Sequence, residues 1–155
     1  MTKRLLLFDI DGTLIDSKGA GIQSLKSVLR HKFGVTDDLT GIEIAGRTDS
    51  GIVHQILRKQ NIPVTEENMA TFLEMYLEFL VGELPQRQGR LLPGVAELLP
   101  RLAARPKNVL ALLTGNLRRG AQLRKLGSQT RVQGGNTIPI LVDELTLRHP
   151  RQRLV

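Results

Sequence analysis

Two carboxylates stand directly after an apolar run near the start of the chain, and their spacing could support chemistry. Residues 5–8 (LLLF) precede Asp9, and Asp11 follows two positions later, just before Gly12. The apolar run predicts a strand buried on both faces, as in a parallel sheet, and ligands bind where such strands end. Two crowded carboxylates imply a metal ion or a proton between them. An ordinary acidic turn is the alternative interpretation.

A second apolar run ends in hydrogen-bonding residues of another kind. Residues 108–113 predict another buried strand, which is followed by Thr114, Gly115 and Asn116. A threonine hydroxyl and backbone N–H groups at the start of a helix donate hydrogen bonds to phosphate oxygens. Taken alone, Thr-Gly-Asn is also a common turn. Its place after a second buried strand favours phosphate binding.

The segment DIDGTL at residues 9–14, placed after an apolar strand, resembles motif I of the haloacid dehalogenase-like hydrolase superfamily. The strand that ends in Thr114 resembles motif II of the same superfamily. The resemblance covers residues 3 to about 123 and is strongest to phosphoglycolate-phosphatase-like members. It implies an α/β fold: an incomplete Rossmann-like parallel sheet with a helical cap inserted after the first strand.

The same resemblance implies a reaction and a cofactor. It implies Mg²⁺-dependent hydrolysis of a small phosphorylated metabolite through an aspartyl-phosphate. Asp9 is then the nucleophile and Asp11 the general acid and base. The Asp9 carboxylate and the Asp11 backbone carbonyl also hold the Mg²⁺ ion, with a third acidic ligand expected from the missing fourth motif, and the metal offsets the repulsion between a carboxylate and a phosphate dianion. The residues implied in substrate binding are Gly12, Thr114, Gly115 and Asn116.

Helical periodicity separates the two strands and predicts the domain organisation. We expect an α/β core at residues 1–15 and 86–123, a helical cap at 16–85, and an atypical basic tail at 124–155. Within the cap, Arg47 stands in a Gly-Arg-Thr-Asp stretch like that of phosphoglycolate-phosphatase-like members, and is a candidate to reach the far end of a substrate. A solvated arginine in a turn is the alternative.

Capping signals predict where the helices begin and end. The Asp16-Ser17 pair is expected to cap the first helix, and Gly34 to end it. Thr36-Asp37-Asp38 is expected to cap a short second segment. The helix that opens near Thr65 is expected to end at Gly82 and Pro85.

The family pattern is lost after residue 123. No Lys-Pro pair of the third motif follows, and Lys125 falls too close behind motif II to match it. Asp143, after the apolar run 137–142, is a candidate for the acidic fourth motif, but Pro139 argues against a central strand there. We therefore expect a C-terminally truncated or frame-shifted member of the superfamily.

The loss of these motifs supports a second hypothesis, in which the chain has the fold of a phosphatase but little or no activity. The chain would then be a catalytically impaired phosphatase-like protein without turnover, because one metal ligand and a positive charge are missing. Loss of the later strands would also expose Leu110 and Leu112 to water or to a partner.

Composition bounds the remaining function classes. Four of the seven excess positive charges lie in residues 124–155, where Arg148, Arg151 and Arg153 could contact nucleic acid. That stretch has no aromatic residue for base stacking, so nucleic acid is not favoured as a partner. The absence of cysteine and of long apolar stretches predicts a cytoplasmic protein with no membrane partner.

Overall fold

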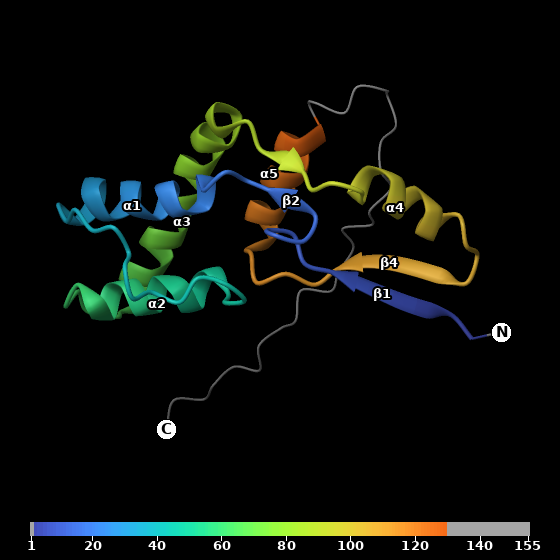
Figure 1. The fold of residues 1–155 in the computed structure, drawn as a ribbon. Helices are drawn as coiled ribbons and strands as arrows, with labels where there is room; N and C mark the ends of the chain where they lie inside the picture. Colours follow the sequence, from blue (N-terminus) through green and yellow to red (C-terminus); the bar gives the residue numbers. More distant parts are fainter. Residues whose placement is uncertain (1, 130–155) are drawn as a thin grey trace.

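The computed structural model describes residues 2–129, with side chains through Arg124 (Figure 1). In chain order, the elements are β1 (Arg4–Phe8), β2 (Ile15–Asp16), α1 (Ala20–Phe33), α2 (Asp49–Lys59), α3 (Glu66–Arg87), β3 (Arg90–Leu91), α4 (Val95–Ala103), β4 (Asn108–Leu112) and α5 (Arg118–Gln129).

A small parallel sheet carries the two predicted chemical segments at one edge. β1 pairs with β4 in parallel, with Leu6 opposite Leu110 and Phe8 opposite Leu112. β2 and β3 form a short antiparallel pair, in which Ile15 faces Leu91. Both parallel strands therefore end at the same side of the sheet, and the predicted incomplete Rossmann-like α/β sheet is confirmed.

The prediction that these strands are buried on both faces is wrong. Leu5 and Leu7 of β1 are 52% and 44% exposed, and Val109 of β4 is 38% exposed. Helix α4 covers the opposite face, where Leu110 is buried and Leu112 is half-buried (Figure 1). The expectation that Leu110 and Leu112 become exposed is therefore also wrong: the uncovered face belongs to the alternate residues of each strand.

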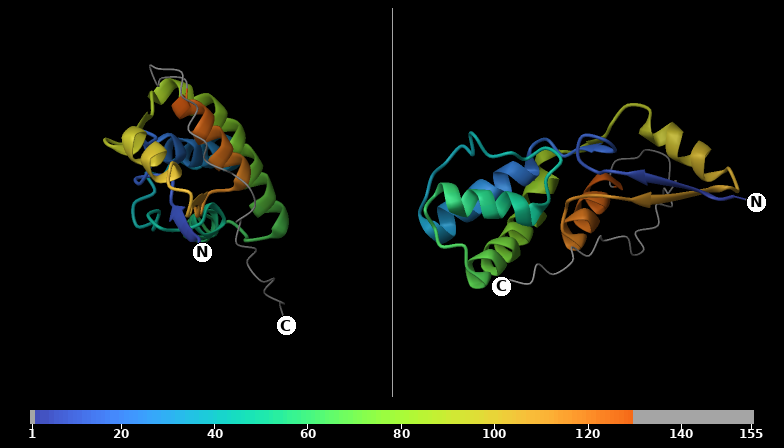
Figure 2. Two further views of the ribbon diagram at one scale, coloured as in Figure 1. Left: turned by 90° about the vertical axis from the view of Figure 1, so that its right-hand side faces the viewer. Right: turned by 90° about the horizontal axis from the view of Figure 1, so that it is seen from below.

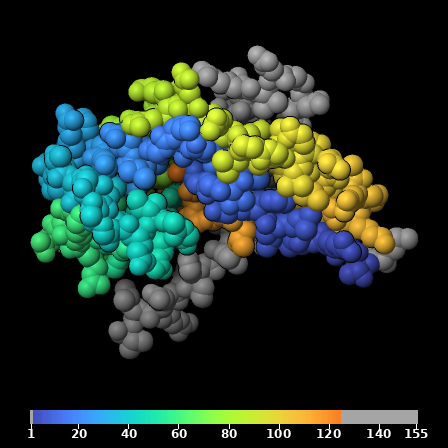
Figure 3. All heavy atoms as spheres, viewed as in Figure 1, coloured from blue at the N-terminus to red at the C-terminus, as the bar shows by residue number. Residues whose placement is uncertain are grey.

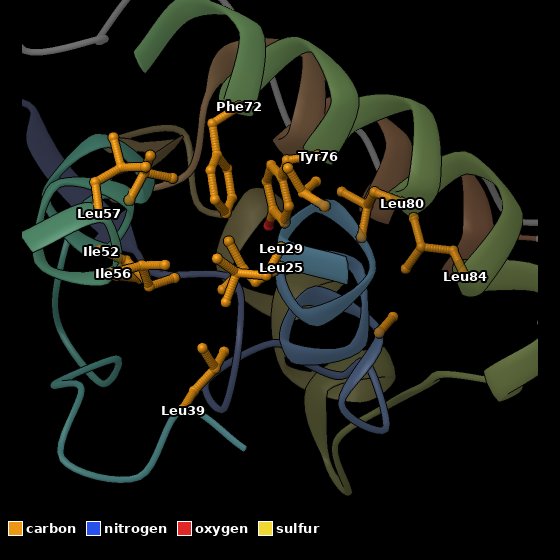
Figure 4. Packing of buried hydrophobic residues seen from close by; sticks show 13 residues of the cluster. Leu25, Leu29, Leu39, Ile52, Ile56, Leu57, Phe72, Tyr76, Leu80 and Leu84 are labelled. Carbon is orange, nitrogen blue, oxygen red and sulfur yellow. The ribbon is translucent and has the colours of Figure 1, made fainter. Parts of the chain in front are cut away.

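Helices α1, α2 and α3 lie between β2 and β3 in sequence and pack around a core of their own. Figure 4 shows Phe72, Tyr76, Leu80 and Leu84 along one side of α3, with Leu29 of α1 beside them. Phe72 is fully buried, and its ring stacks on Phe33 with centroids 6.0 Å apart. We call α1–α3 with their loops, residues 16–87, the helical part.

The ends of these helices follow the sequence only in places. Gly34 ends α1 in the left-handed conformation, as predicted. Asp16 does not cap α1: it accepts a hydrogen bond from the Lys18 N–H, and Gly19 takes the capping position without a side-chain bond. The Asp16 side chain thus stabilises a local turn and is not available to cap the helix, because short side-chain carboxylates can bond to nearby backbone N–H groups in either way.

Two further end predictions are wrong. The segment after Thr36 is a loop and forms no helix, because the Asp37 and Asp38 carboxylates bind the N–H groups of Leu39 and Thr40 in successive turns. Helix α3 continues through Pro85 to Arg87. Pro85 removes only the bond to the carbonyl of residue 81, whose side chain is on the exposed side of the helix.

Thr65 caps α3 as its sequence pattern predicts, and this gives a first testable expectation. Its hydroxyl accepts a hydrogen bond from the Asn68 N–H at 3.1 Å. We expect Thr65→Ala to lower the free energy of unfolding by about 1 kcal/mol, and Thr65→Ser to retain most of it. Urea unfolding of the three proteins measures the difference. Equal stability of the alanine and wild-type proteins would show that the cap contributes nothing.

Two separate hydrophobic clusters result from this arrangement. One lies within the helical part, and the other joins β1 and β4 to α4. Figure 2 shows the helical part at one end of the molecule and the β1–β4 sheet at the other, with α5 between them. α5 contacts α3 on one side and places Ala121 in the α/β cluster on the other. The site described next lies where the two clusters meet.

Candidate active site

A cavity of about 860 Å³ lies between the sheet edge and the helical part. From the sheet edge it is lined by Asp9, Asp11, Thr114, Gly115 and Asn116. From the helical part it is lined by residues that include 44–48 and Tyr76. In Figure 3, residues near 115 (orange) are visible between the segment around residue 45 (cyan) and the N-terminal residues (blue). Five of the six predicted site residues thus face one space.

The sixth predicted residue, Gly12, forms a turn and does not line the cavity. β1 ends at Phe8, so Asp9 and Asp11 are not successive residues of one continuing strand face. Gly12 has a φ of 76°, and its N–H donates to the Ile15 carbonyl at 2.8 Å. This turn folds the chain back and directs Asp11 toward the cavity.

Asn116 connects the two strand ends. Its side-chain amide donates to Asp11 Oδ2 at 3.0 Å and to Thr114 Oγ1 at 2.9 Å. The backbone N–H of Asn116 is also within 3.3 Å of Thr114 Oγ1. The Thr114 hydroxyl therefore accepts from Asn116 and keeps its own proton for donation to another group. An anion in the cavity is such an acceptor.

Arg124 is a buried charge that the sequence interpretation missed. Its side chain belongs to α5 and is only 3% exposed. Nε lies 2.9 Å from Asp11 Oδ2, and Nη2 donates to the Tyr76 hydroxyl at 2.8 Å. Asp11 Oδ1 is buried and, among the described residues, accepts no hydrogen bond. Asp11 is thus held at one oxygen and free at the other.

Asp49, at the start of α2, ties the helical part to the loop after β4. Its carboxylate Oδ2 accepts from the Leu117 N–H at 2.7 Å, and its own N–H donates to the Gly115 carbonyl at 2.9 Å. Only glycine fits at position 115, because a Cβ there would lie 2.4 Å from the Arg47 carbonyl oxygen. Burial raises the pKa of Asp49, whereas the Leu117 N–H and the Arg124 guanidinium lower it.

Arg47, the candidate for contacting the far end of a substrate, lines the cavity but is exposed. Its guanidinium pairs with Glu43, four residues earlier in the same loop. Arg118, at the start of α5, also lines the cavity. The helical part and α5 therefore each bring an arginine to the lining of the cavity.

Tyr76 gives a pH-dependent expectation, because burial raises its pKa to about 12. Arg124 opposes this shift, while Asp49 and Asp11 add to it. The unfolded tyrosine ionises near pH 10. Its contribution to stability is therefore complete below pH 10 and is lost as the pH rises toward 12, by at most about 1.4 kcal/mol per pH unit.

Denaturant unfolding of wild type and Tyr76→Phe on both sides of pH 10 measures this contribution as a difference between the two proteins. The chain has one tyrosine and no tryptophan, so absorbance of the phenolate reports Tyr76 alone. A phenolate that appears near pH 10 in the folded protein would contradict the burial of this hydroxyl.

The chain offers oxygen ligands of the kind that Mg²⁺ prefers. Asp9 and Asp11 stand together at the sheet edge, and the buried Asp11 Oδ1 without a hydrogen-bond donor is an acceptor that a cation would satisfy. Within residues 2–129 no group of three or more histidine, cysteine, aspartate or glutamate side chains converges. Mg²⁺ is commonly bound by one or two carboxylates together with several waters and substrate phosphate, so the residues present fit part of such a site.

The structure does not describe the side chains of the two residues weighed as replacements for the missing motifs. Asp143 is outside the described residues, as are the arginines considered for nucleic acid and Pro139. The side chain of Lys125 is also outside them. For Arg124, one position earlier, the sequence offered only its helical spacing from two small residues, Gly120 and Ala121, which lie on the same face of a helix.

None of the helices in the described part of the chain is both long and apolar enough to cross a membrane. No curated protein matches the sequence closely. Solved structures do share the fold. A hydrolase from Pseudomonas syringae is 21% identical with a TM-score of 0.64, covering 82% of this chain and 56% of its own. CbbY from Rhodobacter sphaeroides in complex with phosphate is 19% identical with a TM-score of 0.66, covering 84% and 58%.

A predicted phosphoglycolate phosphatase from Haemophilus somnus 129pt is 24% identical with a TM-score of 0.54, covering 76% of this chain and 53% of its own. The chain thus spans a little over half the length of these proteins. The sequence model for haloacid dehalogenase-like hydrolases matches residues 6–131, which includes both strand ends and the helical part. The chain therefore belongs to the haloacid dehalogenase-like hydrolase family.

Proposed function

We propose that the protein is a Mg²⁺-dependent phosphomonoester hydrolase that forms an aspartyl-phosphate on Asp9. The observation that carries this proposal is the convergence of Asp9, Asp11 and the Thr114–Asn116 loop on one cavity from two parallel strand ends. A nucleophile, a proton carrier and hydrogen-bond donors for an anion then occupy one space. Cysteine-free composition supports a place in the reducing cytoplasm.

In the proposed reaction an oxygen of Asp9 attacks phosphorus, and the bond from phosphorus to the ester oxygen breaks. Asp11 gives its proton to the leaving alkoxide. A water then attacks the aspartyl-phosphate and loses a proton to Asp11, which releases inorganic phosphate and restores Asp9. Mg²⁺ held by the Asp9 carboxylate and the Asp11 backbone carbonyl would offset the charge repulsion between carboxylate and phosphate, and the Asp11 side chain would remain free to carry the proton.

The neighbouring residues have roles in this proposal that their contacts support. Asn116 and Arg124 hold Asp11 Oδ2 and leave Oδ1 free. The Thr114 hydroxyl and the N–H of Gly115 would donate to the phosphoryl oxygens. Gly12 shapes the turn between the carboxylates and β2 without lining the cavity.

The helical part, in this proposal, acts as a cap of residues 16–85 on a core of residues 1–15 and 86–123. Arg47 and Arg118 line the cavity and would bind the end of a substrate that lies away from Asp9. The solved structures of CbbY hold phosphate and, in a variant, xylulose-1,5-bisphosphate. These support a small phosphorylated metabolite, in a phosphoglycolate-phosphatase-like enzyme, as the substrate class.

A second candidate function is a phosphatase-like protein that binds phosphate without turnover. It is favoured by one observation: only two carboxylates converge at the sheet edge within residues 2–129, and one of them is engaged by Arg124. The family resemblance implies a further acidic ligand for the metal. Without that ligand, the rate of phosphoester hydrolysis is expected to be lower.

Phosphate release from small phosphomonoesters, with added Mg²⁺ and then with a chelator, separates the two candidates. The proposed hydrolase releases phosphate only with the metal, and the rate returns when Mg²⁺ is restored. The binding-only candidate shows no release above buffer, yet inorganic phosphate still stabilises the protein against heat. Release that is unaffected by the chelator would contradict the proposed function.

A further inference from the structure

Arg124 makes contact with both halves of the molecule at once. Its Nη2 donates a hydrogen bond to the hydroxyl of Tyr76, which belongs to α3 and to the helical cluster. Its Nε lies beside Asp11, in the turn that follows β1. The two hydrophobic clusters are separate, so this guanidinium is a buried polar link between the two halves, in addition to the contacts of Asp49 with the loop after β4.

The position of Arg124 is built into the backbone around it. A Cβ on Gly21 of α1 would lie 3.0 Å from Nη2 and 3.4 Å from the Tyr76 hydroxyl. A Cβ on Gly120 of α5 would lie 3.1 Å from Nη1. Two glycines, on different helices, therefore leave the space that the guanidinium occupies. Gly82, in α3, has nothing within 4 Å of its would-be Cβ and shows that a helical glycine need not be crowded.

Arg124 needs partners from both the helical part and the sheet edge to remain buried as a charged group. A buried guanidinium is stable only when charged or polar partners surround it. Tyr76 supplies one partner from α3, Asp11 a second from the sheet edge, and Asp49 a nearby charge from α2. If the helical part moves away from α5, the arginine loses Tyr76 and Asp49 and keeps only Asp11. The geometry of Arg124 at Asp11 thus depends on where the helical part lies.

We propose that Arg124 is a positioning residue that couples docking of the helical part to the placement of the Asp11 carboxylate. The sequence of contacts runs from α3 through the Tyr76 hydroxyl and the guanidinium to Asp11 Oδ2. Asn116 holds the same oxygen from the β4 side, so Arg124 restricts the remaining rotation of the carboxylate. The catalytic part of this inference rests on the proposed role of Asp11 as acid and base.

Tyr76→Phe is the first test, because it removes one hydroxyl and keeps the buried ring. We expect kcat to fall about tenfold with KM changed less than twofold, as for loss of a hydrogen bond to a charged group that orients but does not bind substrate. Arg124→Lys is expected to show the same defect, since one ammonium cannot replace the two-sided guanidinium contact. Gly21→Ala should also lower kcat, because its Cβ would crowd Nη2 of Arg124. Gly82→Ala is the matched control and is expected to leave kcat unchanged.

Hydrogen exchange gives a readout that does not depend on activity. The turn after β1 holds four described amide hydrogen bonds, donated by the N–H groups of residues 12–15. We expect these amides to exchange about tenfold faster in Tyr76→Phe and Gly21→Ala, while the amides of α4 stay protected. Gly82→Ala should match the wild type in this turn.

The two readouts distinguish the possible failures. Wild-type protein without Asp9-dependent turnover would remove the proposed function, and faster exchange in the turn would still support the coupling. Unchanged exchange of the turn amides in both Tyr76→Phe and Gly21→Ala would overturn the coupling, whatever the activity. An equal fall in kcat in the Gly21→Ala and Gly82→Ala variants would also overturn the coupling, because only Gly21→Ala crowds the guanidinium.

Discussion

Asp9→Asn is expected to lower Mg²⁺-dependent phosphate release by about four orders of magnitude or more, as when the nucleophile of a covalent mechanism is removed. The amide cannot form the aspartyl-phosphate, and it carries no charge for the metal. Asp9 is exposed at the sheet edge, so the substitution should leave the fold intact. Phosphate release by wild type and variant at matched protein concentration measures the effect.

Two comparisons make the Asp9 result specific. Glu74→Gln removes an exposed carboxylate from α3, which does not line the cavity, and is expected to retain wild-type turnover. Thermal unfolding of Asp9→Asn should match the wild type, which excludes misfolding as the cause. Turnover that survives in Asp9→Asn would contradict the aspartyl-phosphate mechanism altogether.

Phe72→Ala is expected to have the largest effect on stability, lowering the free energy of unfolding by about 3–5 kcal/mol. Phe72 is fully buried in the helical cluster and stacks on Phe33, so truncation removes its contacts and leaves a cavity. Domains of this size are stable by only about 5–15 kcal/mol, and the helical part would be close to unfolding. Urea unfolding followed by Tyr76 fluorescence reports this region directly.

Val81→Ala is the control for the loss of Phe72. Val81 belongs to the same helix but is 49% exposed, so its truncation should change stability by no more than about 0.5 kcal/mol. If Phe72→Ala were as stable as Val81→Ala, the ring would not be a core residue, and the packing around α3 would need revision.

The parts of the fold with strong periodicity were accessible from sequence. Both parallel strands are short apolar runs that end in polar residues, and this pattern located Asp9, Asp11 and Thr114, which line one cavity. The amphipathic repeats likewise located α1, α2 and α3. These patterns predict individual helices and strands, because each pattern depends only on the residues within one element.

The residues that were missed act through long-range contacts. Arg124 follows the last position at which the family pattern was traced, and only packing against α1 and α3 makes it a buried charge. Asp49 stands in the Gly-Arg-Thr-Asp stretch that was considered for Arg47, yet its carboxylate accepts a hydrogen bond from the N–H of Leu117 in a distant segment. Strand burial was overestimated for a related reason: an apolar run does not specify whether a second helix covers it.

The parallel pairing of β1 with β4 also has a consequence for the order of folding. The whole of residues 9–107 separates the two strands in sequence, whereas α1, α2 and α3 are near neighbours. Contacts between distant segments form slowly, because the intervening chain must first be brought together. On a ribosome, the three helices are complete before β4 has been synthesised. We therefore expect the helical part to fold first, and Asp9 and Thr114 to meet only in the last step.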